Sequence, residues 1–365
     1  MSVKTGIVGL PNVGKSTLFN ALTGTASAQA ENYPFCTIDP NSGEVAVPDF
    51  RLEQLAALAR SRKMIPAKTH FVDIAGLVAG ASKGQGLGNR FLASIREVDA
   101  IAHVVRCFDD PDITHVTTQV NPIDDIITIE TELMLADLDS VLRQRERLVR
   151  RLKSGDAEAR TQDHRLAQAQ DVLEHGKPVH EALIEDVELG HWRCLGLLTA
   201  KPVLYICNVD EEAASEGNAY SREVGAHAAS RGSPWVVCSA LFEEQLVGLD
   251  EEEATAFLES IGCHESGLQR TVSAAYQLLG LITFFTVGPK ETRAWTLSCG
   301  MSAIEAAGRI HRDFSQGFIR AETVSYDDFI AHGGEIGAKE AGKLRAEGRD
   351  YRVKDGDVLR ILFNV

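Results

Sequence analysis

The nine residues GLPNVGKST, Gly9 to Thr17, have the types and spacing of a loop that binds the phosphates of a nucleotide. An apolar run leads into this loop and a helix-like segment follows it, which is the context that the motif requires. Its glycines let backbone N–H groups approach phosphate oxygens, Lys15 reaches the β and γ phosphates, and Ser16 can bind Mg²⁺. The pattern therefore predicts a triphosphate site lined by Asn12, Val13, Gly14, Lys15, Ser16 and Thr17.

A second motif, FVDIAG at 71–76, is a strand-like run that ends in an aspartate, with a glycine three residues later. Beside a phosphate loop, Asp73 is placed to hold Mg²⁺ through water and Gly76 to offer its N–H to the γ-phosphate. Thr37 lies between the two motifs, in a loop that is either an ordinary turn or a switch whose hydroxyl completes the metal shell. We expect metal ligands at Ser16, Thr37 and Asp73, and catalytic groups at Lys15 and Gly76.

These motifs need a β-sheet to position them, and four strand-like runs in the sequence could form it. The segments 69–74, 100–108, 201–209 and 233–240 are short, and several are rich in Val and Ile and nearly continuous in apolar character. Such strands are buried on both faces in parallel sheets that have helices between the strands. We therefore expect an α/β P-loop nucleotide-binding domain of the Ras-like type, with a mostly parallel sheet, in two parts at 1–123 and 200–280.

Two other regions have a different texture. Within 124–199 apolar residues such as Leu142 and Val149 recur at spacings of three and four, which predicts a long amphipathic helix. A glycine stop followed by a capping Asp156 predicts a second helix, and hence an inserted helical hairpin. Within 281–365 short strand-like pieces surround one helix-like run, SAIEAAGRIHRDFSQG, which predicts a small α+β domain.

The chain is acidic, with 52 Asp and Glu against 37 Lys and Arg and a net charge of −15, which argues against an overall attraction to nucleic acid. Two local basic clusters, at 143–153 and 339–354, are either solvated surfaces or phosphate contacts. No apolar run approaches the roughly 20 residues that cross a bilayer. The N-terminus has no signal-peptide pattern, so we expect a cytoplasmic protein without a membrane partner. Scattered cysteines without a CxxC pair indicate neither a zinc site nor disulfides.

The strings GLPNVGKST, YPFCTIDPN, DIAGLVAGASKGQGLGNRFL and DAIAHVVRCF together closely resemble the Obg family and, within it, the Obg-like ATPase (YchF) subfamily. The resemblance extends over essentially the whole chain. Near the C-terminus, GFIRAETVSYDDFI, GAKEAGKLRAEGRDYRVKDGDV and LFNV are similar to a TGS domain, which is a ubiquitin-like β-grasp module. The resemblance implies a switch-type P-loop NTPase with an inserted helical hairpin, a C-terminal TGS domain and partners on the ribosome.

The stretch CNVDE follows a buried strand, at the position where guanine-specific relatives carry N-K-x-D. Their aspartate accepts two hydrogen bonds from guanine, whereas here Val209 replaces the lysine and Glu211 is one methylene longer. The resemblance implies a preference for ATP, with the Asn208 amide and the backbone near Val209 contacting adenine. Asp210 is an extra carboxylate close to the base, so some use of GTP stays open. We expect the base to lie against Asn208, Val209, Glu211, Ser239 and Ala240, with Leu241 where guanine-specific relatives usually have lysine.

Hydrolysis needs a group that the usual motif does not supply. Ras-like relatives place a glutamine after D-x-x-G to orient the attacking water, but this sequence has Leu77. His115 is the catalytic candidate, because a neutral imidazole can orient or deprotonate water near pH 7; a surface histidine is the alternative. His103 lies within a strand, which favours a role in the core. Asn12 stands where cation-dependent relatives help to bind K⁺, so K⁺ is a candidate cofactor beside Mg²⁺, with an ordinary loop asparagine as the alternative.

Together with the resemblance, these residues predict an enzyme, a switch protein that binds ATP and hydrolyses it slowly. The expected partners are ATP and the ribosome or its subunits, with regulation of translation as the expected role. The helical hairpin and the TGS domain are the expected contact surface. Two alternatives remain at this point: a GTP-specific Obg-type ribosome assembly factor, and a nucleotide-gated RNA- or protein-binding module whose hydrolysis is incidental.

Overall fold

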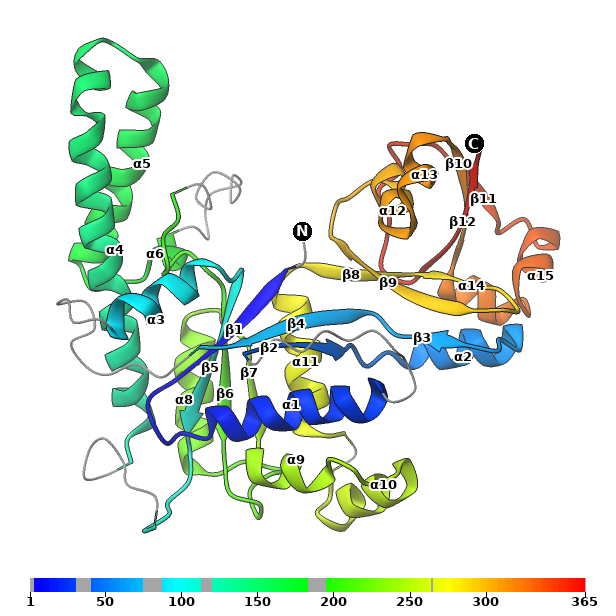
Figure 1. Ribbon diagram of the computed structural model, residues 1–365, viewed down its shortest axis with the longest axis horizontal. Coiled ribbons are helices and arrows are strands. Elements are labelled where there is room, and N and C mark those ends of the chain that lie inside the picture. The colour runs from blue at the N-terminus through cyan, green and yellow to red at the C-terminus, as the bar shows by residue number, and fades with distance from the viewer. Residues whose placement is uncertain are drawn as a thin grey trace. The chain divides into compact units, whose positions relative to one another are not determined.

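The computed structural model describes residues 3–30, 41–74, 87–112, 120–182, 195–263 and 265–364. The chain forms two compact units, and each unit is built from two separate segments of the chain (Figure 1). The first unit comprises Met1–Gly43 and His70–Ala275, and the second comprises Glu44–Thr69 and Tyr276–Val365. Within the described ranges, no helix is both long enough and apolar enough to pass through a lipid bilayer.

The first unit is built on a six-stranded sheet with the order β2-β4-β1-β5-β6-β7. From β4 to β7 neighbouring strands run parallel, and every residue of β5 is buried, so helices cover both faces as the apolar runs predict. The carboxyl ends of these parallel strands therefore meet at one edge. The strands are β1 (Lys4–Val8), β2 (Ser42–Ala46), β4 (Lys68–Asp73), β5 (Ala100–Arg106), β6 (Val203–Asn208) and β7 (Trp235–Cys238).

Helices pack on this sheet and on one another. Figure 1 shows α1 beside the sheet, where it contacts β1 and α9, while α8 contacts β6 and β7. The helices of this unit, apart from the inserted hairpin, are α1 (Lys15–Ala30), α3 (Leu87–Arg96), α8 (Ala219–Ser230), α9 (Ala240–Leu246), α10 (Glu251–Ser260) and α11 (Gly267–Leu278), of which the last three residues belong to the second unit.

The inserted region is a helical hairpin, as predicted. It consists of α4 (Pro122–Lys153) and α5 (Ala157–Glu174), followed by the short α6 (Val179–Ala182), and it has a hydrophobic cluster of its own. Asp156 caps α5 by accepting hydrogen bonds from the N–H groups of Glu158 and Ala159.

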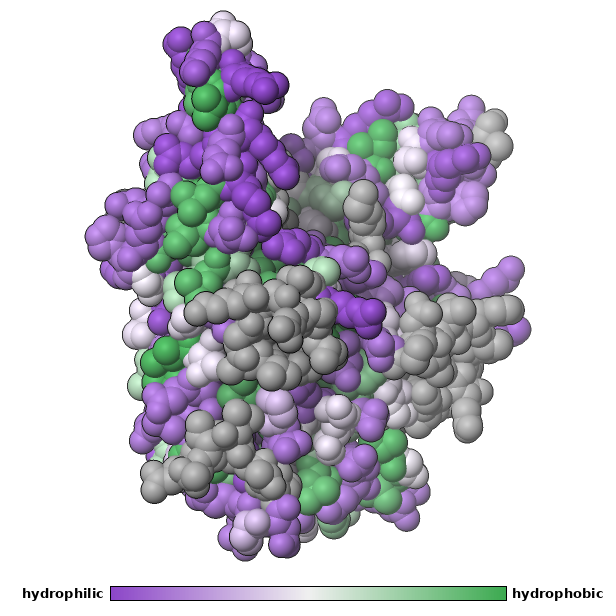
Figure 2. Space-filling model, turned by 60° about the vertical axis from the view of Figure 1, so that its left-hand side comes forward, coloured by the Kyte–Doolittle hydropathy of each residue, from purple (hydrophilic) through white to green (hydrophobic). Residues whose placement is uncertain are grey.

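Two apolar residues of α4 lie beside its buried stripe. Leu142 and Val149 have the spacing of the buried face, yet each is 43% exposed. A helix in a two-helix hairpin has a single long neighbour, so apolar residues beside the contact stripe stay open. Figure 2 accordingly shows a mostly hydrophilic hairpin surface with apolar patches between the polar side chains.

The second unit has its own six-stranded sheet, with the order β11-β10-β12-β8-β9-β3. The β10–β12 and β8–β9 pairs are antiparallel and the central β12–β8 pair is parallel. The strands are β3 (Met64–Ile65), β8 (Leu281–Thr286), β9 (Thr292–Ser298), β10 (Phe318–Ser325), β11 (Arg345–Glu347) and β12 (Asp357–Phe363). The helices are α2 (Phe50–Ala59), α12 (Ala303–Ile310), α13 (Arg312–Gln316), α14 (Tyr326–Ala331) and α15 (Glu335–Glu340).

Two features of this unit differ from the sequence expectations. The helix-like run at 302–317 is two helices, because His311 adopts extended backbone angles and ends α12. The segment 44–69 falls within the expected nucleotide-binding domain but groups with the second unit, although its two ends belong to β2 and β4 of the first sheet. There Arg51 donates a hydrogen bond of 2.6 Å to Asp355, and β3 pairs with β9.

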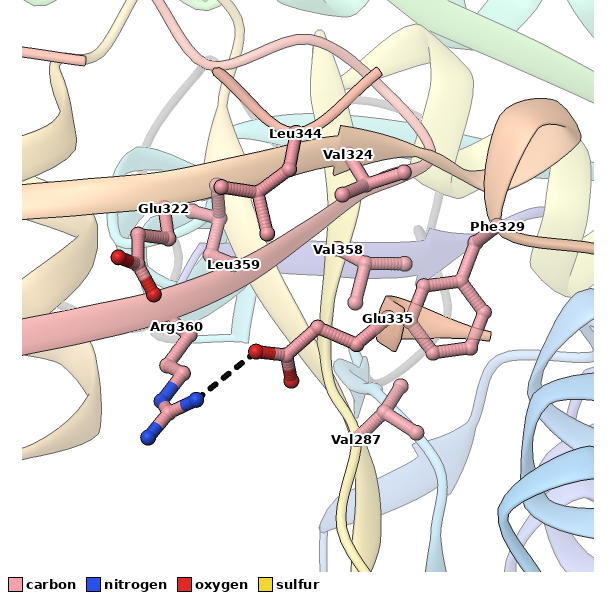
Figure 3. Close-up of a pocket in the computed structure, with 9 residues that line it drawn as sticks. All are labelled: Val287, Glu322, Val324, Phe329, Glu335, Leu344, Val358, Leu359 and Arg360. Atoms are coloured by element: carbon pink, nitrogen blue, oxygen red, sulfur yellow. Dashed lines mark hydrogen bonds and ion pairs between the residues drawn. The ribbon is translucent and has the colours of Figure 1, made fainter. Parts of the chain in front are cut away.

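The second unit contains a small hollow (Figure 3). Its apolar wall comes from strands and helices of that unit, and Arg360 forms a 2.8 Å ion pair with Glu335 beside it. The lining residues are Val287, Glu322, Val324, Phe329, Glu335, Leu344, Val358, Leu359 and Arg360.

Candidate nucleotide-binding site

The phosphate loop joins the end of β1 to the start of α1. Asn12 and Gly14 both have left-handed backbone angles, with φ of 62° and 92°. A Cβ atom at Gly14 would lie 2.2 Å from the amide nitrogen of Asn208, and one at Gly9 would lie 2.6 Å from the carbonyl oxygen of Val104. Close packing therefore requires glycine at both positions, and the backbone shape requires it at Gly14 as well. Such a loop at the start of a helix is suited to an anion.

Two charged side chains of opposite sign lie at this loop. Lys15 is buried, and its Nζ donates a hydrogen bond of 2.8 Å to the carbonyl oxygen of Leu10. Burial lowers the pKa of Lys15, and the nearby charge of Asp73 opposes that shift. Burial likewise raises the pKa of Asp73, opposed by the charge of Lys15. The parallel pairing of β1 with β4 places Asp73 opposite Ile7, close to the start of the loop.

One oxygen of Asp73 has no partner in the described part of the chain. Its Oδ1 is buried and accepts no hydrogen bond. A buried, unpartnered carboxylate oxygen is costly unless a ligand or water satisfies it. The position therefore fits a water molecule bound to Mg²⁺. In the described ranges no three His, Cys, Asp or Glu side chains cluster as metal ligands, so a metal here would depend on hydroxyl and phosphate oxygens too.

Asn208 connects the phosphate loop to the base-binding loops. Its Nδ2 donates a hydrogen bond of 2.9 Å to the carbonyl oxygen of Val13, and its Oδ1 accepts one of 2.9 Å from the backbone N–H of Ala240. The side chain is only 5% exposed. The sequence motif predicts a base contact at Asn208 but does not indicate this second role. One N–H and one lone pair of the amide remain for a ligand.

The loop after β6 is held by its own backbone and side chains. The N–H of Val209 donates to the carbonyl oxygen of Cys238 at 3.0 Å. The carbonyl oxygen of Val209 accepts no hydrogen bond from the residues that the structure describes. Asp210, the extra carboxylate, accepts a hydrogen bond of 2.9 Å from the N–H of Ala213 and so caps its own turn. Glu211 is exposed.

The second base-binding loop begins α9. Ser239 is buried and caps this helix by accepting a hydrogen bond of 3.5 Å from the N–H of Phe242. Leu241 is 61% exposed. An apolar side chain thus stands where guanine-specific relatives have lysine, and it offers a surface for the flat face of a base.

The remaining predicted residues divide into two groups. Ser16 is exposed at the start of α1 and Thr17 is half-buried. Burial lowers the pKa of His103 to about 3, with its ring 5.7 Å from that of Tyr205, so it is the neutral core histidine that the sequence predicts. Outside the described residues lie Thr37, Gly76, Leu77 and His115.

A parallel sheet with a phosphate loop after its first strand, and base loops at the carboxyl ends of β6 and β7, defines a P-loop NTPase. In line with this, residues 4–142 match a family model described as 50S ribosome-binding GTPase. Residues 281–364 match the YchF GTPase C-terminal model, described as a protein of unknown function.

The whole chain is similar to proteins of one family. It is 53% identical to the ribosome-binding ATPase YchF of Haemophilus influenzae and 52% identical to that of Escherichia coli O157:H7, each over 365 residues and 100% of both chains. The structure of the Schizosaccharomyces pombe YchF GTPase matches with a TM-score of 0.89 and 37% identity, over 99% of this chain and 98% of that one. The chain belongs to the YchF family, which confirms the predicted resemblance and fold.

The names of these relatives differ in one respect. The two bacterial proteins are called ATPases, whereas the fission yeast protein is called a GTPase. The base preference of this chain therefore has to follow from its own base-binding loops.

Proposed function

We propose that this protein is a slow, Mg²⁺-dependent ATPase that associates with the ribosome in the cytoplasm. The observation that carries the ATPase assignment is the hydrogen-bonded connection from the phosphate loop through Asn208 to base loops that depart from the guanine pattern. The association with ribosomes rests on full-length similarity to proteins named ribosome-binding ATPases.

The phosphate end is prepared for a Mg²⁺–triphosphate. Ser16, Thr37 and Asp73 would hold the ion, directly or through water, and the ion would neutralise phosphate charge. The Lys15 ammonium is poised to exchange its bond to Leu10 for a phosphate oxygen. Because burial lowers the pKa of Lys15, an anionic ligand should stabilise its protonated form. Gly76 would add a backbone N–H to the γ-phosphate.

The base end favours adenine. Adenine carries an exocyclic amine that donates hydrogen bonds and a neighbouring ring nitrogen that accepts them. The carbonyl oxygen of Val209 can accept from the amine, and the remaining N–H of Asn208 can donate to a ring nitrogen. Asp210 accepts a hydrogen bond from the N–H of Ala213 through Oδ1, which ties this carboxylate to its own turn.

Hydrolysis is assigned to His115 and a monovalent cation. Leu77 cannot orient water, so His115 supplies the imidazole that does. K⁺ held with the help of Asn12 would offset charge that develops on the transferred phosphoryl group. Slow intrinsic turnover, about 10⁻⁴ to 10⁻² s⁻¹, is expected of such an unaided switch NTPase.

Ribosome contact is assigned to basic surfaces of the hairpin and of the C-terminal unit. On α4, Arg147 and Arg150 are exposed. Arg151 is different, because it pairs with Asp156 at 2.8 Å and Glu158 at 3.0 Å. The C-terminal cations are Lys339, Lys343, Arg345, Arg349, Arg352 and Lys354.

Single-turnover hydrolysis with and without ribosomes tests this function. The proposal predicts ATP turnover that ribosomes accelerate and that Lys15→Ala abolishes. Nucleotide-dependent ribosome binding without acceleration would instead indicate a nucleotide-gated binding module. Acceleration of GTP hydrolysis alone would indicate a GTPase assembly factor.

A further inference from the structure

The helix α11 forms hydrogen bonds with the backbone beside both base-binding loops, through residues that belong to no sequence motif. The Nη2 of Arg270 donates hydrogen bonds to two backbone carbonyl oxygens, that of Val237 at 3.1 Å and that of Ala214 at 3.4 Å. Val237 lies in β7, two residues before Ser239. One guanidinium group thus joins the strand that leads to the second base loop and the turn that follows the first.

The Ala214 contact acts on the turn that presents Glu211. The N–H of Ala214 donates to the carbonyl oxygen of Glu211 at 3.2 Å, and the N–H of Ala213 donates to Asp210. Ala214 is itself buried. A change in the position of Ala214 would therefore be transmitted directly to Glu211 through this tight turn.

The start of α11 is fixed against the second of these loops. The N–H of Gly267 donates a hydrogen bond of 2.6 Å to the buried carboxylate of Glu243, in α9. A Cβ atom at Gly267 would lie 3.0 Å from the Cα of Cys238, so a larger residue would push the helix and the strand end apart by a few tenths of an ångström. Burial raises the pKa of Glu243, and its hydrogen bond to Gly267 and the charge of Arg270 oppose that shift. Arg270 is thereby held at a defined position under the loops.

We propose that Arg270 is a positioning residue for base recognition, which sets the two base-binding loops at the separation that adenine requires. This inference rests on the proposed adenine preference. Both hydrogen bonds come from Nη2, a planar nitrogen whose two N–H groups have fixed directions, and a lysine ammonium does not reproduce this geometry. The hydrogen bonds of Arg270 go to the backbone beside the base-binding loops, so its loss should affect binding of the base and not binding of the phosphates.

The experiment compares Arg270→Met and Arg270→Lys with wild type, using calorimetric titration with non-hydrolysable ATP and GTP analogues and with inorganic tripolyphosphate, all with Mg²⁺. Arg270→Met should weaken binding of the ATP analogue about tenfold and that of tripolyphosphate by no more than about twofold. The ATP-over-GTP ratio should fall accordingly. Arg270→Lys should restore part of the ratio. At saturating ATP, kcat should stay near the wild-type value while KM rises.

A matched control is Arg231→Met in the same unit. Arg231 pairs with Glu130 at 3.1 Å and Glu181 at 2.9 Å, away from the base loops. Its loss should lower stability without changing the ATP-over-GTP ratio. If Arg270→Met weakens tripolyphosphate and ATP equally, or keeps the wild-type ratio, the positioning role is overturned. If wild type itself binds ATP and GTP equally, the adenine assignment fails instead.

Discussion

Replacing Asn208 with alanine removes the side chain that connects the phosphate loop to the second base loop. The substitution leaves the carbonyl oxygen of Val13 and the N–H of Ala240 without their present partners, in a position that is 5% exposed. It also opens space beside Gly14, against which the amide now packs. Both loops should then move independently before a nucleotide binds.

The expected magnitude follows from these two lost partners. A buried donor or acceptor left unsatisfied costs about 1–3 kcal/mol, so the free energy of unfolding should fall by about 2–6 kcal/mol. A typical domain is stable by about 5–15 kcal/mol, so the variant should still fold in most of that range. Because ATP must then order both loops, its affinity should fall at least about tenfold.

Asn218→Ala is the matched control. Its amide also donates to a buried strand end, the carbonyl oxygen of Cys107 at 2.6 Å, and accepts from the N–H of Ser221 at 3.0 Å. It does not touch the phosphate loop. Urea unfolding should show a loss of stability in both variants, and calorimetry should show lost ATP affinity in Asn208→Ala only. Equal ATP affinity in the two variants, at equal folded fraction, would refute the role given to Asn208.

Four further predictions address charge and catalysis. Burial lowers the pKa of His103 from 6.5 to about 3. Between these two pH values the unfolded chain binds more protons than the folded protein. The free energy of unfolding in urea should therefore fall as the pH decreases, by up to about 1.4 kcal/mol per pH unit. His103→Gln should reduce this dependence of stability on pH, and an unchanged dependence would contradict the assignment to His103. Asp73→Asn should reduce the gain in ATP affinity on adding Mg²⁺ without lowering apo stability, since burial already raises the pKa of that carboxyl; full retention of the Mg²⁺ effect in calorimetry would exclude Asp73 from the metal site. His115→Ala should slow single-turnover hydrolysis at least about tenfold with little change in ATP affinity, and hydrolysis should be faster in K⁺ than in Na⁺. An unchanged rate in the variant would exclude His115 from the mechanism, and equal rates in the two salts would exclude the cation. Reversing the charges of Arg147 and Arg150 should weaken co-sedimentation with ribosomes and reduce its salt dependence. Unchanged co-sedimentation would show that this face of α4 does not contact the ribosome.

Much of the fold could be predicted because its signals are local. Apolar runs ending in glycine or aspartate marked β1 and β4, and capping by Asp156 marked the second helix of the hairpin. No local signal groups the segment 44–69 with the second unit, because distant partners decide its place. Arg51 meets Asp355, and β3 pairs with β9, far along the chain.

The site shows the same division. The phosphate loop and the base motif were recognisable because their glycines, lysine and asparagine have fixed spacing. The connection from Asn208 to Val13 spans 195 residues, and Arg270 acts through backbone carbonyls of Val237 and Ala214. Backbone carbonyls exist at every position, so contacts of this kind leave no pattern in the sequence. An arginine in an amphipathic helix is ordinarily assigned to the surface.

The central claim is that the loops after β6 and β7 select adenine. Calorimetric titration of the wild-type protein with Mg²⁺ and non-hydrolysable ATP and GTP analogues measures this directly. Tighter binding of the ATP analogue is predicted, and the double substitution Val209→Lys with Glu211→Asp should move the preference toward GTP. Equal affinities in the wild type, or tighter binding of the GTP analogue, would contradict the claim.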